Sequence, residues 1–512
     1  MNKTIKNILI ILILFISIAG VVLPKELNNL DEIWNFNFAR CIADGLLPYK
    51  DFNMVQTPLL PILCGIILKL TFNEMIVMRI LAILLMTACF FASYKILERL
   101  NVHRYIINLF IVGIYLMFYN YFCIDYNYAV LLISLIIIYI ELKYEMFDVD
   151  PKRDFWLGIL VGSSILFKQT TGLALTVISI FYKLLLVSNK DACKKVFKII
   201  IYRSIGVLTP ILLFVIYLTI NNIWIDFLDY TIFSISTFSN KISYIQLIKG
   251  NYGLLTQLLS ILVPITVLFL YYITICKRNI SREQKNLFIL FCYSVASMVV
   301  VYPISDSIHF LIGALPTLIS FCYLMYIFIN NVVLNNKKCH KAKAEIKNIM
   351  KHLGLLTTII IIIISSLKTI QYLKIANEYE DLKHFIFIPV FNEGIKKIDD
   401  YIIQEQNKNN KVLILDAAAA IYMIPIEKYT KDYDLFLKGN LGAKGENGQI
   451  EKLRKENNNT IVLILKDKYK KNWQTPENVI EYIKQNWKKI DEIEQFNIYI
   501  KKGTNDGKNN MQ

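Results

Sequence analysis

Long apolar runs are the feature of this sequence that most limits what it can fold into. A membrane-spanning helix needs about 20 predominantly apolar residues, with some allowance for tilt. Hydrophobic residues make up 55% of the 512-residue chain and charged residues 19%, which lies outside the usual range of a soluble domain. The sequence therefore predicts an all-α polytopic membrane protein of about eleven transmembrane helices. We place them near residues 7–24, 75–96, 105–122, 128–142, 156–167, 172–188, 200–220, 253–276, 285–301, 310–332 and 353–372.

The positive charge of the chain is a signal of topology. The formal net charge is +16, but Lys and Arg fall in short clusters between apolar runs, which argues against one basic surface for nucleic acid. If the short run 58–72 does not cross, the loops on one side hold 23 Lys and Arg and the opposite loops hold 6. The positive-inside rule then predicts a multi-pass protein of the cell membrane with a cytoplasmic N-terminus, an interfacial or re-entrant 58–72 and an external C-terminus.

The cysteines and the first apolar run add little chemistry. The nine cysteines mostly lie within apolar runs and show no CxxC or Cys/His spacing, so neither a zinc site nor a disulfide framework is expected. No small-residue cleavage site follows the first run, which we interpret as an uncleaved helix. The bias toward Ile, Lys and Asn is typical of a low-GC bacterium. In such a cell the protein would act on the outer face of the cytoplasmic membrane.

The composition changes near residue 374, where Lys, Asn, Asp and Glu become frequent between short apolar clusters. We therefore expect a transmembrane domain over 1–373, with a first external loop at 25–74, and a small external α/β domain over 374–502. The α/β domain is predicted from strands at 411–416, 460–467 and 496–502 and an amphipathic helix at 479–490. Residues 503–512 form a polar tail that we expect to be disordered.

The first candidate site is the carboxylate pair Asp31 and Glu32, one short step beyond the first span. The pair opens an amphipathic stretch that suits a helix lying at the membrane interface. A partly desolvated carboxylate there can act as general base toward a hydroxyl or amine. The alternative is a helix cap, because Asn28 or Asn29 and Asp31 precede an apolar pattern. The chemistry favours the site.

Three further places carry polar residues on the predicted outer side. Asp125, Tyr126 and Asn127 lie in a turn between apolar runs and are either loop residues or substrate-binding groups. Lys168 and Gln169 follow a run too short to cross, so the ammonium lies at bilayer depth, where an ionisable group usually faces a cavity or a partner.

Lys168 is accordingly our first candidate for an anionic head group. Asp306 and His309 lie three residues apart at the mouth of a span. Two ligands are too few for a metal, so hydrogen bonding to a polar head group is favoured. Arg79, early in the second span, is either a phosphate ligand or a snorkelling arginine.

Taken together, these features resemble the membrane glycosyltransferases of the GT-C fold, in particular the protein O-mannosyltransferase and aminoarabinose transferase branch, or glycosyltransferase family 39. Those enzymes have an Asp-Glu pair at the start of the first external loop, a juxtamembrane helix, and a proline-led segment of the form H-P-P-L-Y-P. Here the matching features are Asp31-Glu32, residues 33–46 and QTPLLP at 56–61. The likeness covers roughly residues 1–200, and Gln-Thr stands where the family has His-Pro.

The resemblance implies a polyprenyl-phosphate sugar donor, inversion at the anomeric carbon, and Asp31 as the base with Glu32 as its neighbour or alternate. Arg79, Lys168, Gln169 and His309 would then serve the donor phosphate, and Asp125, Tyr126, Asn127 and Asp306 the substrate. No cofactor is expected. A divalent ion at Asp31, Glu32 and Asp125 is the alternative. The acceptor is left open among protein, lipid and polymer.

Two other functions compete with this one. A lipid-linked-sugar transporter or flippase would share the architecture, but it more often shows paired halves with broken helices, and we find no such repeat. An envelope polymer ligase usually depends on a large external loop late in the chain. In this chain the acidic pair Asp31-Glu32 lies in the first external loop, which favours the glycosyltransferase.

Overall fold

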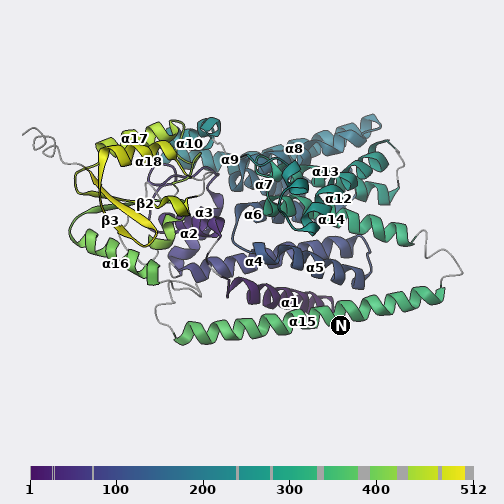
Figure 1. Ribbon diagram of the computed structural model, residues 1–512. Coiled ribbons are helices and arrows are strands. Elements are labelled where there is room, and N and C mark those ends of the chain that lie inside the picture. The colour runs from purple at the N-terminus through teal and green to yellow at the C-terminus, as the bar shows by residue number, and fades with distance from the viewer. Residues whose placement is uncertain are drawn as a thin grey trace, which may run out of the picture. The chain divides into compact units, whose positions relative to one another are not determined.

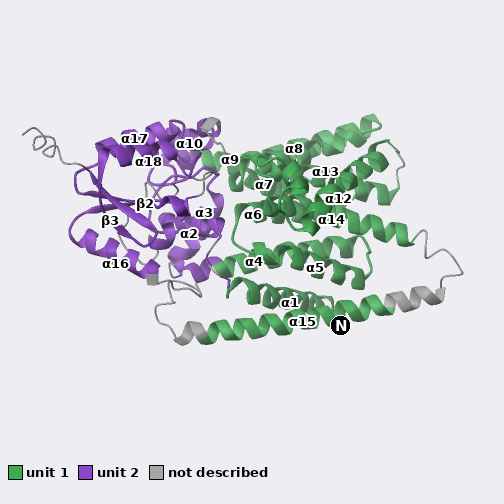
Figure 2. Cartoon of the chain, in the orientation of Figure 1, with its two compact units in different colours: residues 1–24, 79–215, 241–377 green, residues 25–78, 216–240, 378–512 purple. Residues whose placement is uncertain are grey.

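Two compact units make up the fold of this chain (Figure 2). The computed structural model describes residues 2–25, 27, 29–71, 74–237, 241–276, 281–330, 340–378, 393–423, 436–470 and 475–501. Unit 1 comprises residues 1–24, 79–215 and 241–377, and unit 2 comprises 25–78, 216–240 and 378–512. The first loop and the C-terminal segment therefore belong to the same unit although they are far apart in sequence. The predicted disordered tail, 503–512, lies outside the described residues.

Helices build unit 1 (Figure 1), and each of the eleven predicted spans overlaps one of them. Within the described part of the chain, nine helices are long and apolar enough to cross a membrane, which indicates a membrane protein. The helices are α1 (Lys3–Val22), α4 (Met75–Arg99), α5 (Arg104–Phe118), α6 (Tyr126–Lys143), α7 (Pro151–Phe167), α8 (Gln169–Phe181), α9 (Lys190–Ile220), α11 (Ile245–Lys249), α12 (Leu254–Tyr271), α13 (Arg282–Met298), α14 (Ser307–Phe328) and α15 (His340–Glu378).

Two of the eleven predicted spans, at 105–122 and 156–167, coincide with α5 and α7, which are shorter than the nine helices counted above. Helix α5 has 15 residues and tightens into a 3₁₀ turn at Tyr119–Tyr121. Helix α7 has 17 residues and ends where Lys168 adopts an extended backbone, with φ −151° and ψ 115°. The next helix, α8, begins directly after that residue and continues as a 3₁₀ turn over Tyr182–Leu186.

Four charged side chains from consecutive elements meet inside unit 1. Arg203 of α9 lies 2.5 Å from Glu141 of α6 and 2.9 Å from Asp154 of α7. Lys183, in the turn after α8, lies 3.1 Å from Glu141. All four side chains are almost fully buried. Two positive and two negative charges offset one another there, which is the condition under which charges persist in a low-dielectric interior.

Unit 2 contains a four-stranded sheet of order β1-β2-β4-β3, in which β1 and β2 are parallel and the other pairs are antiparallel. Its near-continuous apolar strands are explained by helices on both faces. Leu413 and Leu415 of β1 pack toward α17 and α18, while Val412 and Ile414 pack toward α16 (Figure 1). The elements are α16 (Glu393–Asn407), β1 (Lys411–Leu415), α17 (Gly445–Lys455), β2 (Thr460–Leu465), α18 (Glu477–Asn486), β3 (Trp487–Ile493) and β4 (Phe496–Lys501).

The predicted strands at 411–416, 460–467 and 496–502 are therefore confirmed, but the predicted helix at 479–490 is wrong at its end. Helix α18 stops at Asn486, and the following residues form β3 at the edge of the sheet. Five of the seven side chains of β3 are exposed. The strand forms because it pairs with β4. Since only its first side chain is buried, its sequence lacks the alternation of apolar and polar residues that predicts a strand.

The first loop packs directly on the C-terminal part of unit 2. It supplies α2 (Leu30–Ala43) and α3 (Leu59–Leu70), and residues 216–240 add α10 (Trp224–Thr231). Phe38 and Phe52 belong to an apolar cluster with Ala417 and Leu437. The indole Nε1 of Trp34 donates a 2.7 Å hydrogen bond to the Ala417 carbonyl. The first loop is thus part of the same folded body as the sheet.

Helix α3 corresponds to the run that was expected not to cross. Its 12 residues span about 18 Å at 1.5 Å per residue, well short of the roughly 30 Å hydrocarbon core. Leu60, Cys64 and Leu68 are buried, whereas Leu63 and Ile66 are exposed on the opposite side. A short helix with one exposed apolar face suits a membrane interface.

Candidate functional site

The carboxylate pair Asp31 and Glu32 lies in the first turn of α2, in unit 2. Asn29 is the N-cap, and its Oδ1 accepts a 2.9 Å hydrogen bond from the backbone N–H of Asp31. The cap was one interpretation of this stretch, and Asn29 fills that role. Asp31 and Glu32 instead follow inside the helix, where the dipole of the first turn favours carboxylates.

The two carboxylates differ in exposure. Asp31 is half-buried, whereas Glu32 has 1% of its surface exposed. The carbonyl of Asp31 also accepts a 2.7 Å hydrogen bond from the side chain of Asn35, one turn along. Asp31 is thus the member of the pair that a ligand can reach without opening the helix, and Glu32 is better suited to support it from within.

A second polar cluster lies in unit 1, where α6 begins. Asp125 caps α6, and its Oδ1 accepts a 2.6 Å hydrogen bond from the backbone N–H of Asn127. The Oδ1 of Asn127 accepts a 2.7 Å hydrogen bond from the ammonium of Lys168, which also lies 5.4 Å from the ring centre of Tyr126. The structure therefore brings together four residues that the sequence placed in two separate motifs.

The break between α7 and α8 positions the ammonium of this cluster. Lys168 is half-buried and takes the extended conformation that separates the two helices. Gln169 is the half-buried first residue of α8. Because the chain turns at this point, the lysine side chain reaches the start of α6 instead of continuing along a helix face. Asn127 is a polar partner of Lys168 in the structure, and the predicted role of this lysine toward an anionic head group stays a prediction.

The third predicted pair begins α14. Asp306 caps this helix, and its Oδ1 accepts a 2.9 Å hydrogen bond from the backbone N–H of His309. The same oxygen lies 2.8 Å from Nδ1 of the His309 ring. The aspartate therefore fixes the orientation of the imidazole and leaves Nε2 as the ring nitrogen able to meet a ligand. The sequence had predicted hydrogen bonding of the two residues to a polar head group, and that role stays a prediction.

Electrostatics link this pair with the α6 cluster. Burial raises the pKa of Asp125 to about 6, and the negative charge of Asp306 acts in the same direction. The hydrogen bonds from Asn127 and the charge of Lys168 lower that pKa and limit the rise. Burial also raises the pKa of Tyr252, again assisted by Asp306. Asp125, Lys168 and Asp306 thus form one electrostatically coupled group.

Arg79 takes a different position. It is fully buried in α4, and its guanidinium donates a 2.8 Å hydrogen bond to the carbonyl of Leu23, just beyond α1. This contact satisfies one of the carbonyls that a helix leaves unpaired at its C-terminal end. The observed contact ties α4 to the end of α1 and belongs to the packing of unit 1.

The opposite ends of α6 carry different kinds of polar group. Asp125 precedes its first turn, and Glu141 of the buried ionic group lies in its last turn. Glu141 is sixteen positions after Asp125, which corresponds to about 24 Å along the axis. The intervening helix is mainly apolar. The distance between the two polar groups is therefore similar to the thickness of the hydrocarbon layer of a membrane, which is about 30 Å.

Sequence reasoning missed two groups of polar residues. Glu141, Asp154, Lys183 and Arg203 were missed because they lie far apart in the sequence and no motif joins them. Asp416 was also missed, although it directly follows the strand KVLIL and a polar residue after a buried strand is a usable signal. In the described part of the chain, no three His, Cys, Asp or Glu side chains are arranged to hold a metal ion.

Comparison with known proteins adds no assignment. No protein-family model matches the chain, and no curated protein matches it either. The functional argument therefore depends on the residues themselves.

Proposed function

We propose that this chain is an integral membrane glycosyltransferase that moves a sugar from a polyprenyl-phosphate donor to an acceptor on the outer face of the cytoplasmic membrane. The observation that carries the proposal is the acidic first turn of α2, which follows the first apolar helix and is packed on an α/β body. The orientation rests on the charge pattern of the loops, with 23 Lys and Arg on the inner side and 6 on the outer.

In this proposal Asp31 is the general base. Its carboxylate takes the proton from an acceptor hydroxyl or amine while that oxygen or nitrogen attacks the anomeric carbon of the donor. The bond between the anomeric carbon and the phosphate oxygen breaks, and its electron pair stays with the phosphate. The products are the glycosylated acceptor, inverted at the anomeric carbon, and polyprenyl phosphate. Glu32, the next residue in the sequence, is buried and supports the base.

The donor phosphate is assigned to the unit 1 cluster. A polyprenyl chain stays in the bilayer, so its phosphate needs cations at the ends of membrane helices. Lys168 supplies the positive charge, and its ammonium donates a hydrogen bond to Asn127, which holds the lysine in place. The His309 ring, oriented by Asp306, is assigned to the same phosphate. The charge of Lys168 and the hydrogen bonds from Asn127 act against the negative charge of Asp125 beside them. Gln169, next to Lys168, is assigned to the donor phosphate as well. Tyr126 and Asp306 are assigned to the substrate, and Arg79 to the packing of α4 against the end of α1.

The test is transfer of radiolabelled sugar from polyprenyl-phosphate donors in membranes that contain the wild type, Asp31→Asn or Asp44→Asn. Asp44 is an exposed aspartate at the other end of the same helix and serves as the matched control. We expect Asp31→Asn to lower transfer at least about 100-fold, the size of a lost general base, and Asp44→Asn to leave transfer unchanged. If donor crosses the bilayer without transfer in every protein, the chain is a transporter and the proposal fails.

A further inference from the structure

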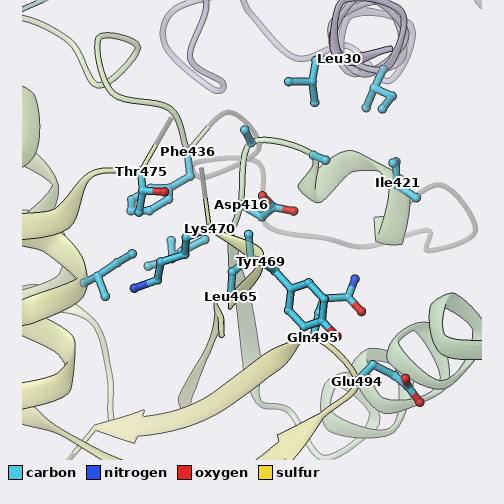
Figure 3. Close-up of a pocket in the computed structure, with 15 residues that line it drawn as sticks. Leu30, Asp416, Ile421, Phe436, Leu465, Tyr469, Lys470, Thr475, Glu494 and Gln495 are labelled. Carbon is cyan, nitrogen blue, oxygen red and sulfur yellow. The ribbon is translucent and has the colours of Figure 1, made fainter. Parts of the chain in front are cut away.

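A cavity of about 460 Å³ lies within unit 2, at the edge of the sheet where β1 and β2 end (Figure 3). Leu415 and Leu465, the last residues of these parallel strands, both line it. Polar residues around it are Asp416, Tyr469, Lys470, Thr475, Glu494 and Gln495. Ligands of α/β sheets bind characteristically outside the carboxyl ends of parallel strands. The volume also falls within the range of small-molecule sites.

The charged groups of the cavity define what it can bind. Lys470 pairs with Asp467 at 2.6 Å, and Glu494 pairs with Lys397 at 3.0 Å. Figure 3 shows the Asp416 carboxylate near the middle of the lining residues and the Lys470 ammonium directed away from it. Asp416, Glu494 and Lys470 are the charged residues of the lining, so carboxylates outnumber ammonium groups, which disfavours an anionic ligand. Carboxylate oxygens also accept hydrogen bonds from hydroxyl groups.

The remaining groups suit an uncharged ligand with many hydroxyls. Gln495 has an amide that both donates and accepts, and its Nε2 donates to the hydroxyl of Tyr422, which orients the side chain. Tyr469 adds a phenol to the lining. Leu30, Ile33 and Phe436 form apolar walls. Alternating polar groups and apolar walls match a sugar ring, which has hydroxyls at its rim and C–H groups on its faces.

The cavity also reaches the helix that carries the proposed base. Leu30 and Ile33, which line the cavity, flank Asp31 and Glu32 in the first turn of α2. The Trp34 indole holds the same helix against Ala417, which follows Asp416 and lines the cavity as well. A ligand in this cavity would therefore lie beside the first turn of α2.

We propose that this cavity binds a neutral, hydroxyl-rich saccharide group, and that this group is part of the acceptor. The second half of the statement rests on the proposed glycosyltransferase function. The first half is a property of unit 2 alone. The acceptor class is accordingly a glycan or glycoconjugate whose sugar portion enters the cavity and offers a hydroxyl at the start of α2.

Binding is tested on the full chain in lipid nanodiscs by saturation-transfer NMR with maltose, cellobiose and chitobiose as probes. We expect at least one neutral disaccharide to bind in the millimolar range. Asp416→Ala removes the central acceptor, and Ala418→Trp fills the cavity without changing charge. Each variant should weaken binding at least 10-fold. Glu451→Ala, an exposed carboxylate on α17, is the matched control and should leave binding unchanged.

Three outcomes would overturn the proposal. They are the absence of binding by all three disaccharides, binding that both cavity variants leave unchanged, and binding of inorganic phosphate or ethanolamine in place of saccharides. Hydrogen exchange of the β1 and β2 amides shows whether each variant is folded. Ala418→Trp keeps Asp416, so it tests the cavity even if Asp416→Ala unfolds.

The transfer assay separates this proposal from the proposed function. If Asp416→Ala raises the acceptor KM at least 10-fold and leaves the donor KM unchanged, both stand. If transfer depends on Asp31 but the acceptor KM is the same in Asp416→Ala, the acceptor site is wrong and the glycosyltransferase stands. If disaccharides bind in the cavity and the wild type transfers no sugar, the saccharide site stands and the enzyme does not.

Discussion

Unit 1 and unit 2 handle buried carboxylates differently. In unit 1, Asp125 has a pKa of about 6 because hydrogen bonds from Asn127 and the charge of Lys168 oppose the effect of burial. In unit 2, Asp399 of α16 is also buried, but the negative charge of Asp400 adds to the effect of burial, and its pKa rises to about 8. Unit 1 therefore holds charge by pairing it, while unit 2 holds a carboxyl group by keeping it protonated.

The difference follows from what surrounds each unit's core. The helices of unit 1 bring opposite charges together, as in the group of Glu141, Asp154, Lys183 and Arg203. The sheet of unit 2 has an apolar layer on each face. Its polar groups gather at the edge where β1 and β2 end. The stability of unit 1 should therefore be sensitive to the loss of one charge. The stability of unit 2 should be sensitive to pH and to packing.

The largest effect is expected from Arg203→Met in unit 1. Within the described part of the chain, this change leaves the buried Glu141 and Asp154 with only the cations Lys183 at 3.1 Å and Arg153 at 3.5 Å, which should reduce the free energy of unfolding by about 3–5 kcal/mol. Thermal unfolding of the purified chain in detergent provides the measurement. Lys198→Met, at an exposed position of the same helix, is the control and should be nearly neutral. Equal melting temperatures for both variants would contradict the pairing argument.

The second effect concerns Asp399 and pH. Its folded pKa of about 8 lies above the ordinary value of 3.8, so the folded chain binds this proton more tightly than the unfolded chain. The associated stability is complete below about pH 4 and is lost as the pH rises toward 8. Asp399→Asn should therefore stabilise unit 2 at pH 8 by at least about 2 kcal/mol and have little effect at pH 4.

Hydrogen exchange of the α16 and β1 amides, followed between pH 5 and 8 after correction for intrinsic rates, measures this change within the full chain. Asp400→Asn is the matched variant. It removes only the neighbouring charge, so its effect at pH 8 should have the same sign and a smaller size. A wild-type unit 2 whose protection is independent of pH would refute the assignment.

The third comparison uses one glycine from each unit. A Cβ at Gly65 of α3 would lie 2.8 Å from the Ala39 carbonyl of α2, whereas a Cβ at Gly113 of α5 meets nothing within 4 Å. Gly65→Ala should destabilise the chain by about 1–3 kcal/mol through overpacking. Gly113→Ala should stabilise it by roughly 0.5–1 kcal/mol through helix propensity. Melting temperatures that move in the same direction would contradict the close contact of α2 and α3.

The smallest effect is expected from Trp34→Phe. This change keeps an aromatic ring in the cluster but removes the hydrogen bond to the Ala417 carbonyl, which is worth about 1 kcal/mol. Exchange of the amides around Ala417 should accelerate accordingly. Trp156→Phe, at an exposed position of α7, should leave those amides unchanged. Faster exchange throughout both units would mean that the effect is global instead of local.

Much of this fold could be predicted from periodicity and composition. Apolar runs identified the helices of unit 1, and the buried strands KVLIL and TIVLIL identified β1 and β2. The start of α2 was contained in the less favoured interpretation of that stretch, a helix cap at Asn28 or Asn29 and Asp31, and the structure has Asn29 as the cap. These features are local, and each is specified by residues within a few turns of one another.

The parts that escaped prediction depend on contacts between distant residues. Strand β3 exists because β4 pairs with it, and its own residues are mostly exposed. The buried ionic group of unit 1 joins single charges from Glu141 to Arg203. Asp125 and Lys168 were each selected as candidates, but only the break between α7 and α8 brings Lys168 to Asn127. Sequence patterns found these residues without showing which of them meet.

The contact of Trp34 with Ala417 has a consequence for biosynthesis. The two residues are 383 positions apart, and the similar hydrogen bond from Asn53 to Asn440 joins residues 387 positions apart. At about 5–20 residues per second, a ribosome needs roughly 20–80 s to make the intervening chain. During that interval Phe38 and Phe52 have left the ribosome without the surface around Ala417 and Leu437. The first loop therefore spends most of synthesis with these aromatic side chains uncovered, which is the condition in which a chaperone binds.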